Sequence, residues 1–126
     1  YKIFEKQGVK IGVFGLGIEL RGLVLEKHFG SVKYVDPVGV AKEMVQTLKA
    51  QKCNLIICIS HLGYKYEDDP NKISDIHLAQ KVEGIDVILG GHTHTFLDKP
   101  DEIISKSGHK TIINQVGWAG IRLGRV

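Results

Sequence analysis

The segment Ile85–Thr95 reads IDVILGGHTHT and joins a short apolar run to two glycines and a pair of histidines. An apolar run of this kind is typical of a β-strand that is covered on both faces. Residues two apart on a strand point the same way, so His92 and His94 are expected to face one side if the strand geometry continues through them. Gly90 and Gly91 would let the backbone turn tightly or come close to a bound group. Neutral imidazole is the commonest protein ligand of metal ions, and the segment therefore predicts metal ligands at a strand end.

A second apolar run, Leu55–Ile59, ends in the element Ser60–Gly63, which reads SHLG. This run also lacks alternation, and we expect it to form a strand that is covered on both faces. A single histidine after a strand, such as His61, is commonly no more than a polar cap. Two apolar strands that each turn at a histidine and a glycine are harder to explain in that way, and together they favour a shared metal site.

Further segments place these two strands in an α/β fold. The Asp36-Pro37 pair is a clear helix start, because Asp caps the helix and Pro fits its first position. The other elements that we expect are a hairpin of strands at Tyr1–Glu5 and Val9–Phe14, a short strand at Ser31–Val35, a helix from Asp36 to about Gln51, a surface loop at Tyr64–Lys72, a helix from Ser74 or Asp75 to about Gly84, and a strand at Thr111–Val116. This alternation puts both histidine motifs at the carboxyl ends of adjacent strands, where ligands of α/β sheets collect.

Composition and charge narrow the classes of function. The chain has 126 residues, 43% hydrophobic and 25% charged, which is ordinary for a globular protein. It begins with Tyr1 instead of Met, and we expect it to be a processed or excised piece of a longer protein. Its formal charge of +3 is small and its basic residues are scattered, which does not favour nucleic acid or a membrane surface as partner. No segment approaches the ~20 apolar residues of a bilayer span, and Cys53 and Cys58 cannot build a disulfide scaffold.

Hydrolysis at a pair of metal ions normally needs carboxylate ligands as well as histidines, and the sequence offers few candidates. A D-x-H motif occurs at Asp75–His77, but it opens the helix that follows a polar loop. We expect Ser74 or Asp75 to cap this helix and His77 to be exposed; the alternative is that Asp75 supports a ligand histidine by accepting a hydrogen bond from it. No Gly in the chain is followed by Asp or Asn. The predicted metal site is therefore incomplete within this sequence.

The two histidine motifs resemble the last two metal motifs of the calcineurin-like metallophosphoesterases, and more narrowly those of the 5′-nucleotidase family. The resemblance extends to VKIGVFGLG at Val9–Gly17, to the helix that starts at Asp36-Pro37, and to the closing segment INQVGWAGIRLGRV. It covers essentially the whole chain. The pairing of SHLG with GGHTHT about thirty residues later is far more specific than two spaced histidines alone.

This resemblance implies a metal-dependent phosphomonoester hydrolase that acts on nucleoside 5′-monophosphates. It further implies two divalent metal ions, Zn, Mn, Fe or Co, with His61 and His92 as ligands of one ion and His94 as a ligand of the other. The family's earlier motifs, D-x-H, G-D-x-x-D and G-N-H-[ED], have no counterpart here. Catalytic residues are therefore expected upstream, and no residue of this chain is assigned to an organic cofactor.

Residues 1–126 are accordingly expected to be a single partial domain, the C-terminal portion of a metallophosphoesterase catalytic domain. The resemblance implies an α/β fold in which this portion supplies one sheet of a two-sheet sandwich flanked by helices in four layers. We expect the portion to be inactive alone, to need the remaining half of the catalytic domain, and to come from a periplasmic or extracellular parent.

Two other classes of function remain open at the level of sequence. The stretch Gly15–Leu20, GLGIEL, lacks one glycine of the dinucleotide-binding fingerprint, and Asp36 lies near the distance of a ribose-binding acid, so a dinucleotide-binding oxidoreductase domain is an alternative. Leu20 stands in the place of the third glycine, and the histidine motifs stay unexplained. The other alternative is a non-catalytic structural or binding fragment, which would form a homodimer to cover an exposed sheet face. Tyr64 and Tyr66 are candidates for a substrate mouth, although a solvent-facing loop is favoured, and Trp118 is expected to be a packing residue.

Overall fold

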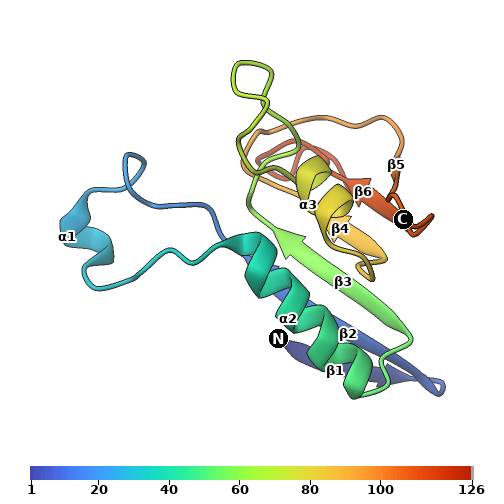
Figure 1. Cartoon of the computed structure of the whole chain (residues 1–126). Helices are drawn as coiled ribbons and strands as arrows, with labels where there is room; N and C mark the ends of the chain where they lie inside the picture. The colour runs from blue at the N-terminus through green and yellow to red at the C-terminus, as the bar shows by residue number, and fades with distance from the viewer. Residues whose placement is uncertain (126) are drawn as a thin grey trace.

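A six-stranded mixed sheet forms the body of the computed structural model, which describes residues 1–125 (Figure 1). The strands lie in the order β1-β2-β3-β4-β6-β5. The elements are β1 Lys2–Lys6, β2 Val9–Leu16, α1 Glu26–Phe29, α2 Pro37–Ala50, β3 Leu55–Ser60, α3 Asp75–Lys81, β4 Val87–Leu89, β5 Asp101–Ile104 and β6 Lys110–Asn114. The predicted α/β class is confirmed. Val126, the last residue of the closing motif, lies outside the described residues.

The strands that end in the histidine motifs are neighbours. β3 and β4 pair in parallel, with Ile57 opposite Val87 and Ile59 opposite Leu89. β2 and β6 extend the parallel region on either side, whereas β1 and β5 are antiparallel edge strands. The carboxyl ends of the four parallel strands β2, β3, β4 and β6 therefore lie side by side at one end of the sheet. The predicted placement of both histidine motifs at the carboxyl ends of adjacent strands is confirmed.

Helices α2 and α3 lie on the same face of the sheet (Figure 1). Asp36 caps α2 as predicted, and its Oδ2 accepts a hydrogen bond of 2.8 Å from the Gly39 N–H. The buried stripe of α2, which is Pro37, Ala41, Val45 and Leu48, repeats with helical spacing. Ala41, Val45 and Leu48 of this stripe pack in one apolar core with the inward residues Ile56 and Cys58 of β3. None of the helices in residues 1–125 is long and apolar enough to cross a membrane.

The opposite face of the sheet is open, contrary to the expectation that β3 and β4 are covered on both faces. Ile56 and Cys58 are buried, but Ile59 is 56% exposed and Leu89 is 39% exposed. An apolar hollow of about 510 Å³ lies on this side, lined among others by Phe4 and Ile59. Burial is one-sided because no described helix or strand packs on this face.

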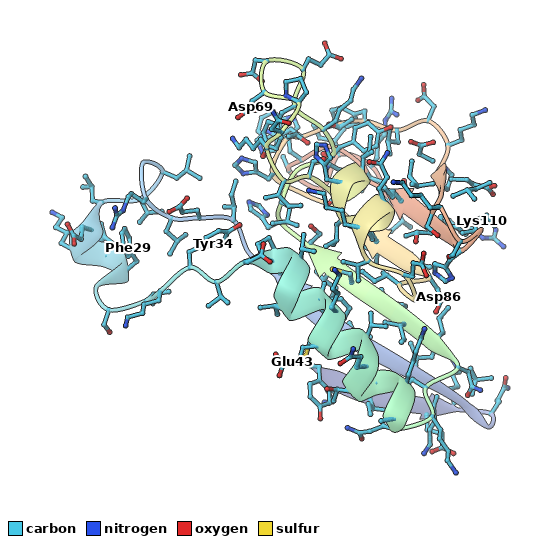
Figure 2. All side chains as sticks on the ribbon, in the orientation of Figure 1. Phe29, Tyr34, Glu43, Asp69, Asp86 and Lys110 are labelled. Carbon is cyan, nitrogen blue, oxygen red and sulfur yellow. The ribbon has the colours of Figure 1, made fainter. Side chains whose placement is uncertain are left out.

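One predicted strand is absent, and one strand was not predicted. Ser31–Val35 is not a strand but part of an irregular connection, because Val32 and Val35, both 62% exposed, find no sheet edge with which to pair. Phe29 of α1 and Tyr34 in the connection after it lie away from the sheet (Figure 2). Strand β5 was not predicted, since its four residues, DEII, show too little alternation to be recognised.

The remaining predicted elements are present with small shifts. The hairpin β1–β2 turns at Gln7 and Gly8, which both have positive φ. Helix α3 begins after Ser74, whose side chain accepts a hydrogen bond from the His77 N–H, and it ends at Lys81, earlier than expected. β4 and β6 are shorter than the predicted strands at Ile85–Leu89 and Thr111–Val116.

Candidate metal centre

His61 and His92 face each other across the ends of β3 and β4. Their ring centroids are 5.2 Å apart and the ring planes make an angle of 67°. His61 directly follows β3, and its backbone N–H donates a 2.9 Å hydrogen bond to the carbonyl of Leu16, the last residue of β2. The two imidazoles are thus delivered by neighbouring parallel strands, as the sequence predicted.

This separation suits two ligands of one ion. A metal ~2.1 Å from a ring nitrogen lies about 3.2 Å from that ring's centroid, so two imidazoles at a tetrahedral angle have centroids about 5.2 Å apart. The observed distance between His61 and His92 is 5.2 Å. The centroid separation of the pair is therefore compatible with two ligands of one divalent cation. Within residues 1–125, however, no three His, Cys, Asp or Glu side chains gather closely enough to hold an ion.

His94 is directed elsewhere, because the strand geometry does not continue through the motif. β4 ends at Leu89, and both His92 and His94 adopt left-handed backbone conformations with φ of 75° and 55°. The His94 ring stacks on Trp118 with a centroid separation of 5.5 Å and an interplanar angle of 18°. The expectation that the two histidines face one side as successive strand residues is therefore wrong. His92 and His94 have different neighbours, which is compatible with the assignment of the two histidines to different metal ions. That assignment stays a prediction.

The pKa of His92 is lowered from its ordinary value. Partial burial of the ring is the main cause, followed by the nearby charges of His61, Lys72 and His94. Each of these effects disfavours the imidazolium form. Because a histidine must be neutral to bind a metal, His92 keeps its ligand form to a lower pH than an unperturbed histidine.

The loop between β3 and α3 closes over this pair. Tyr66 lies near His92, with 6.4 Å between ring centroids, and its hydroxyl donates a 2.7 Å hydrogen bond to Leu62 O. Lys72 Nζ lies 4.0 Å from the centroid of the Tyr66 ring. The hydroxyl of Tyr64 instead donates to Asp101 Oδ2 at 2.8 Å. Of the two tyrosines considered for a substrate mouth, Tyr66 thus lies beside the histidines, and Tyr64 bonds to β5.

Asp75 lies buried directly beneath the site and does not hydrogen-bond to a histidine. Its Oδ1 accepts from the hydroxyl of Ser60, while its Oδ2 has no partner. Burial raises the pKa of Asp75 to about 6, although the Ser60 hydrogen bond acts in the opposite direction. Ser74 caps α3 as predicted, whereas His77 is partly buried, with Nδ1 3.1 Å from Ser74 Oγ.

Gln115 belongs to the site, although reasoning from the sequence did not select it. It directly follows β6 at the same sheet edge, is 1% exposed, and its side chain bonds to the GGHTHT segment. A signal was available: a long polar side chain directly after a buried strand needs hydrogen-bond partners. Trp118, expected to be a packing residue, is 54% exposed and packs on His94.

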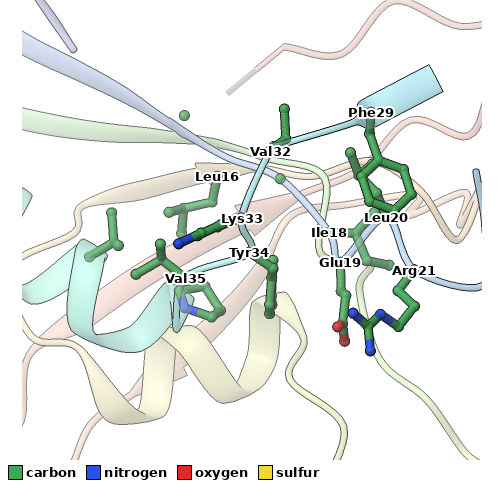
Figure 3. Close-up of a pocket in the computed structure, with 14 residues that line it drawn as sticks. Leu16, Ile18, Glu19, Leu20, Arg21, Phe29, Val32, Lys33, Tyr34 and Val35 are labelled. Atoms are coloured by element: carbon green, nitrogen blue, oxygen red, sulfur yellow. The ribbon is translucent and has the colours of Figure 1, made fainter. Parts of the chain in front are cut away.

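The glycines of β2 do not form a dinucleotide site. Gly15 and Gly17 lie at the end of the strand, but an irregular segment follows them, and the next helix, α1, begins only at Glu26. The dinucleotide fingerprint requires a helix that opens directly at its glycines. The oxidoreductase alternative is therefore wrong. The irregular segment instead lines a cavity of about 760 Å³, with Glu19 and Arg21 among the lining residues (Figure 3).

The known proteins that are similar in sequence and structure include a nucleotide phosphoesterase and 5′-nucleotidases. The chain is 34% identical over 127 residues to the trifunctional nucleotide phosphoesterase protein YfkN of Bacillus subtilis, a match that covers 100% of this chain and 8% of that protein. It is 38% identical over 100 residues to a 5′-nucleotidase of Vibrio vulnificus, or 74% of this chain and 18% of that protein. The crystal structure of a 5′-nucleotidase precursor from Thermus thermophilus matches with a TM-score of 0.71 and 27% identity, over 91% of this chain and 23% of that one. No protein-family model matches. The chain spans less than a quarter of the length of each of these relatives.

Proposed function

This chain belongs to the 5′-nucleotidase family of the calcineurin-like metallophosphoesterases, and from that premise we propose that it supplies part of the metal centre with which a longer protein hydrolyses phosphate monoesters. The observation that carries the proposal is the approach of His61 and His92 from adjacent parallel strands, with ring centroids 5.2 Å apart. Nucleoside 5′-monophosphates are the proposed substrate class, supported by the nucleotidase relatives.

The histidines hold divalent cations in this proposal. His61 and His92 bind one ion, and His94 binds a second ion. Imidazole nitrogens of this kind suit Zn²⁺, Mn²⁺, Fe²⁺ or Co²⁺. Such ions polarise the phosphoryl group and lower the pKa of bound water. The chain's own contribution is to present the imidazoles in neutral form, which the lowered pKa of His92 favours.

The rest of the centre is proposed to come from the other half of the catalytic domain. Residues 1–126 would be the C-terminal portion of that domain, inactive alone, and the bridging carboxylate would lie upstream. The open sheet face around Ile59 and Leu89 supports this arrangement, because it exposes apolar side chains that a second sheet would bury. A periplasmic or extracellular location is proposed for the parent by analogy with the family alone.

The test is Mn²⁺-dependent release of phosphate from AMP by the natural protein that carries this sequence and by the 126-residue chain, side by side. Activity in the natural protein alone is expected, and His61→Ala should lower both this activity and the bound metal per molecule. His28→Ala is the matched control, because His28 is exposed on α1. Activity of the 126-residue chain alone would overturn the shared centre, and full metal content in His61→Ala would remove His61 from it. Sedimentation of the 126-residue chain tests the homodimer alternative, which a concentration-independent monomer would contradict.

A further inference from the structure

The buried side-chain amide of Gln115 forms three hydrogen bonds with the histidine segment, which is Gly90–Thr95. Gln115 Oε1 accepts hydrogen bonds from the backbone N–H of Thr95 and, at 3.0 Å, from the hydroxyl of Thr93. Gln115 Nε2 donates a 2.9 Å hydrogen bond to Gly91 O. The side chain is almost fully buried, at 1% exposure. The hydrogen bonds from this amide to the segment therefore fall on alternate residues, Gly91, Thr93 and Thr95.

The three residues that hydrogen-bond to Gln115 flank the two histidines. Residues 91, 93 and 95 are held from the sheet side, and His92 and His94 lie between them without a bond to Gln115. We propose that Gln115 is a positioning residue of the metal centre, which fixes His92 and His94 in the orientation that binds metal. This inference rests on the proposed function, and it assigns to Gln115 a role that acts through the histidines.

The backbone of the segment needs such support. His92 and His94 have φ of 75° and 55°, a region that residues with a side chain seldom occupy. Conformations of this kind persist where the surrounding structure over-determines them, and they cluster at functional sites. β4 cannot supply that support, because it ends at Leu89. The bonds from Gln115 fall on the residues directly before, between and after the two histidines.

The same network reaches the His61 side of the site. Thr93 Oγ1 accepts a 3.0 Å hydrogen bond from the Tyr64 N–H while it donates to Gln115. Tyr64 follows the SHLG element that carries His61. The Thr93 hydroxyl thereby links the two loops, and the position of Gln115 bears on the spacing of His61 and His92.

The contacts need an acceptor on one side and a donor on the other, and an amide supplies both at every pH. Oε1 faces an N–H that can only donate, and Nε2 faces a carbonyl that can only accept. In Gln115→Glu the carboxylate keeps the shape and can still accept from Thr95, but it cannot donate to Gly91 O. The second carboxylate oxygen of Glu would then face Gly91 O without a proton between them. The two oxygens would repel each other in this buried position, and the backbone before His92 would move.

The experiment measures Co²⁺ binding to the metal-free natural protein, by affinity and by the visible absorption spectrum of the bound ion. Gln115→Glu should lower the affinity about 10- to 100-fold, the range found when residues that orient metal ligands are changed, and should alter the spectrum. Thr111→Val is the matched control. Thr111 is fully buried at the other end of β6 and donates to Ile85 O at 2.8 Å, away from the histidines. It should cost stability and leave the affinity within about twofold.

Wild-type affinity and spectrum in Gln115→Glu would overturn the inference. His61→Ala separates this failure from failure of the metal centre itself: if it also binds Co²⁺ normally, the proposed centre is wrong, and if it alone loses Co²⁺, only the role of Gln115 is wrong. Should Gln115→Glu not fold, Thr93→Val decides, because it removes one hydroxyl and keeps the side-chain shape. A several-fold loss of affinity with a changed spectrum supports the inference, and unchanged binding overturns it.

Discussion

Gly90 lies against two buried polar side chains and leaves no space for a side chain of its own. A Cβ added at Gly90 would lie well under 3.0 Å from Asp75 Oδ2 and 3.0 Å from Gln115 Nε2. Both neighbours are buried, at 0% and 1% exposure, and each already holds hydrogen bonds, Asp75 from Ser60 and Gln115 with the histidine segment. Since Gly90 does not have positive φ, its requirement for glycine is one of space. Gly90→Ala should therefore disturb the packing without straining its own backbone.

The expected cost follows from what must move. Overpacking of a close-packed interior costs about 1–3 kcal/mol. A displaced carboxylate or amide also loses a hydrogen bond, worth about 1 kcal/mol net. We expect Gly90→Ala to lower the free energy of unfolding by about 2–4 kcal/mol and, because Gln115 is displaced, to weaken metal binding as well.

Urea unfolding of the metal-free natural protein measures this loss, with Gly17→Ala as the control. Gly17 lies at the same edge of the sheet, has no atom within 4 Å of the added Cβ and has no positive φ. Its substitution should change the free energy of unfolding by less than about 1 kcal/mol, in the stabilising direction if at all. Equal unfolding free energies for the two variants would refute the close approach of Gly90 to Asp75 and Gln115.

Two further predictions concern Asp75 and Asp36. Burial raises the pKa of Asp75 to about 6 from 3.8, so the folded protein binds this proton more tightly than the unfolded chain. Stability of the metal-free protein should thus fall by up to about 3 kcal/mol as the pH rises from about 4 to about 6. Asp75→Asn should flatten this part of the profile in urea unfolding, and parallel profiles would contradict the buried carboxyl. Asp36→Ala removes the cap on the Gly39 N–H and should cost about 0.5–2 kcal/mol; an unchanged urea midpoint would show that the cap contributes nothing.

The sequence was sufficient for features that depend on local pattern. The Asp36-Pro37 start of α2 and the adjacency of β3 and β4 followed from capping chemistry and from apolar runs. Features set by distant contacts were not readable. The left-handed conformations of His92 and His94 depend on bonds from Gln115, which lies more than twenty residues later in the chain.

The unexpected exposure of β3 and β4 carries information of its own. In β3 the exposed Ile59 lies beside the buried Cys58, and the partly exposed Ile57 lies between two buried residues, yet the sequence LIICIS is apolar at nearly every position. A strand with a solvated face is expected to alternate apolar and polar residues, whereas a strand covered on both faces reads as a continuous apolar run. The run therefore matches burial that residues 1–125 do not themselves provide. Leu89 at the end of β4 shows the same mismatch at 39% exposure. The open face and the incomplete histidine set thus support, by independent routes, the proposal that another half of the domain completes both.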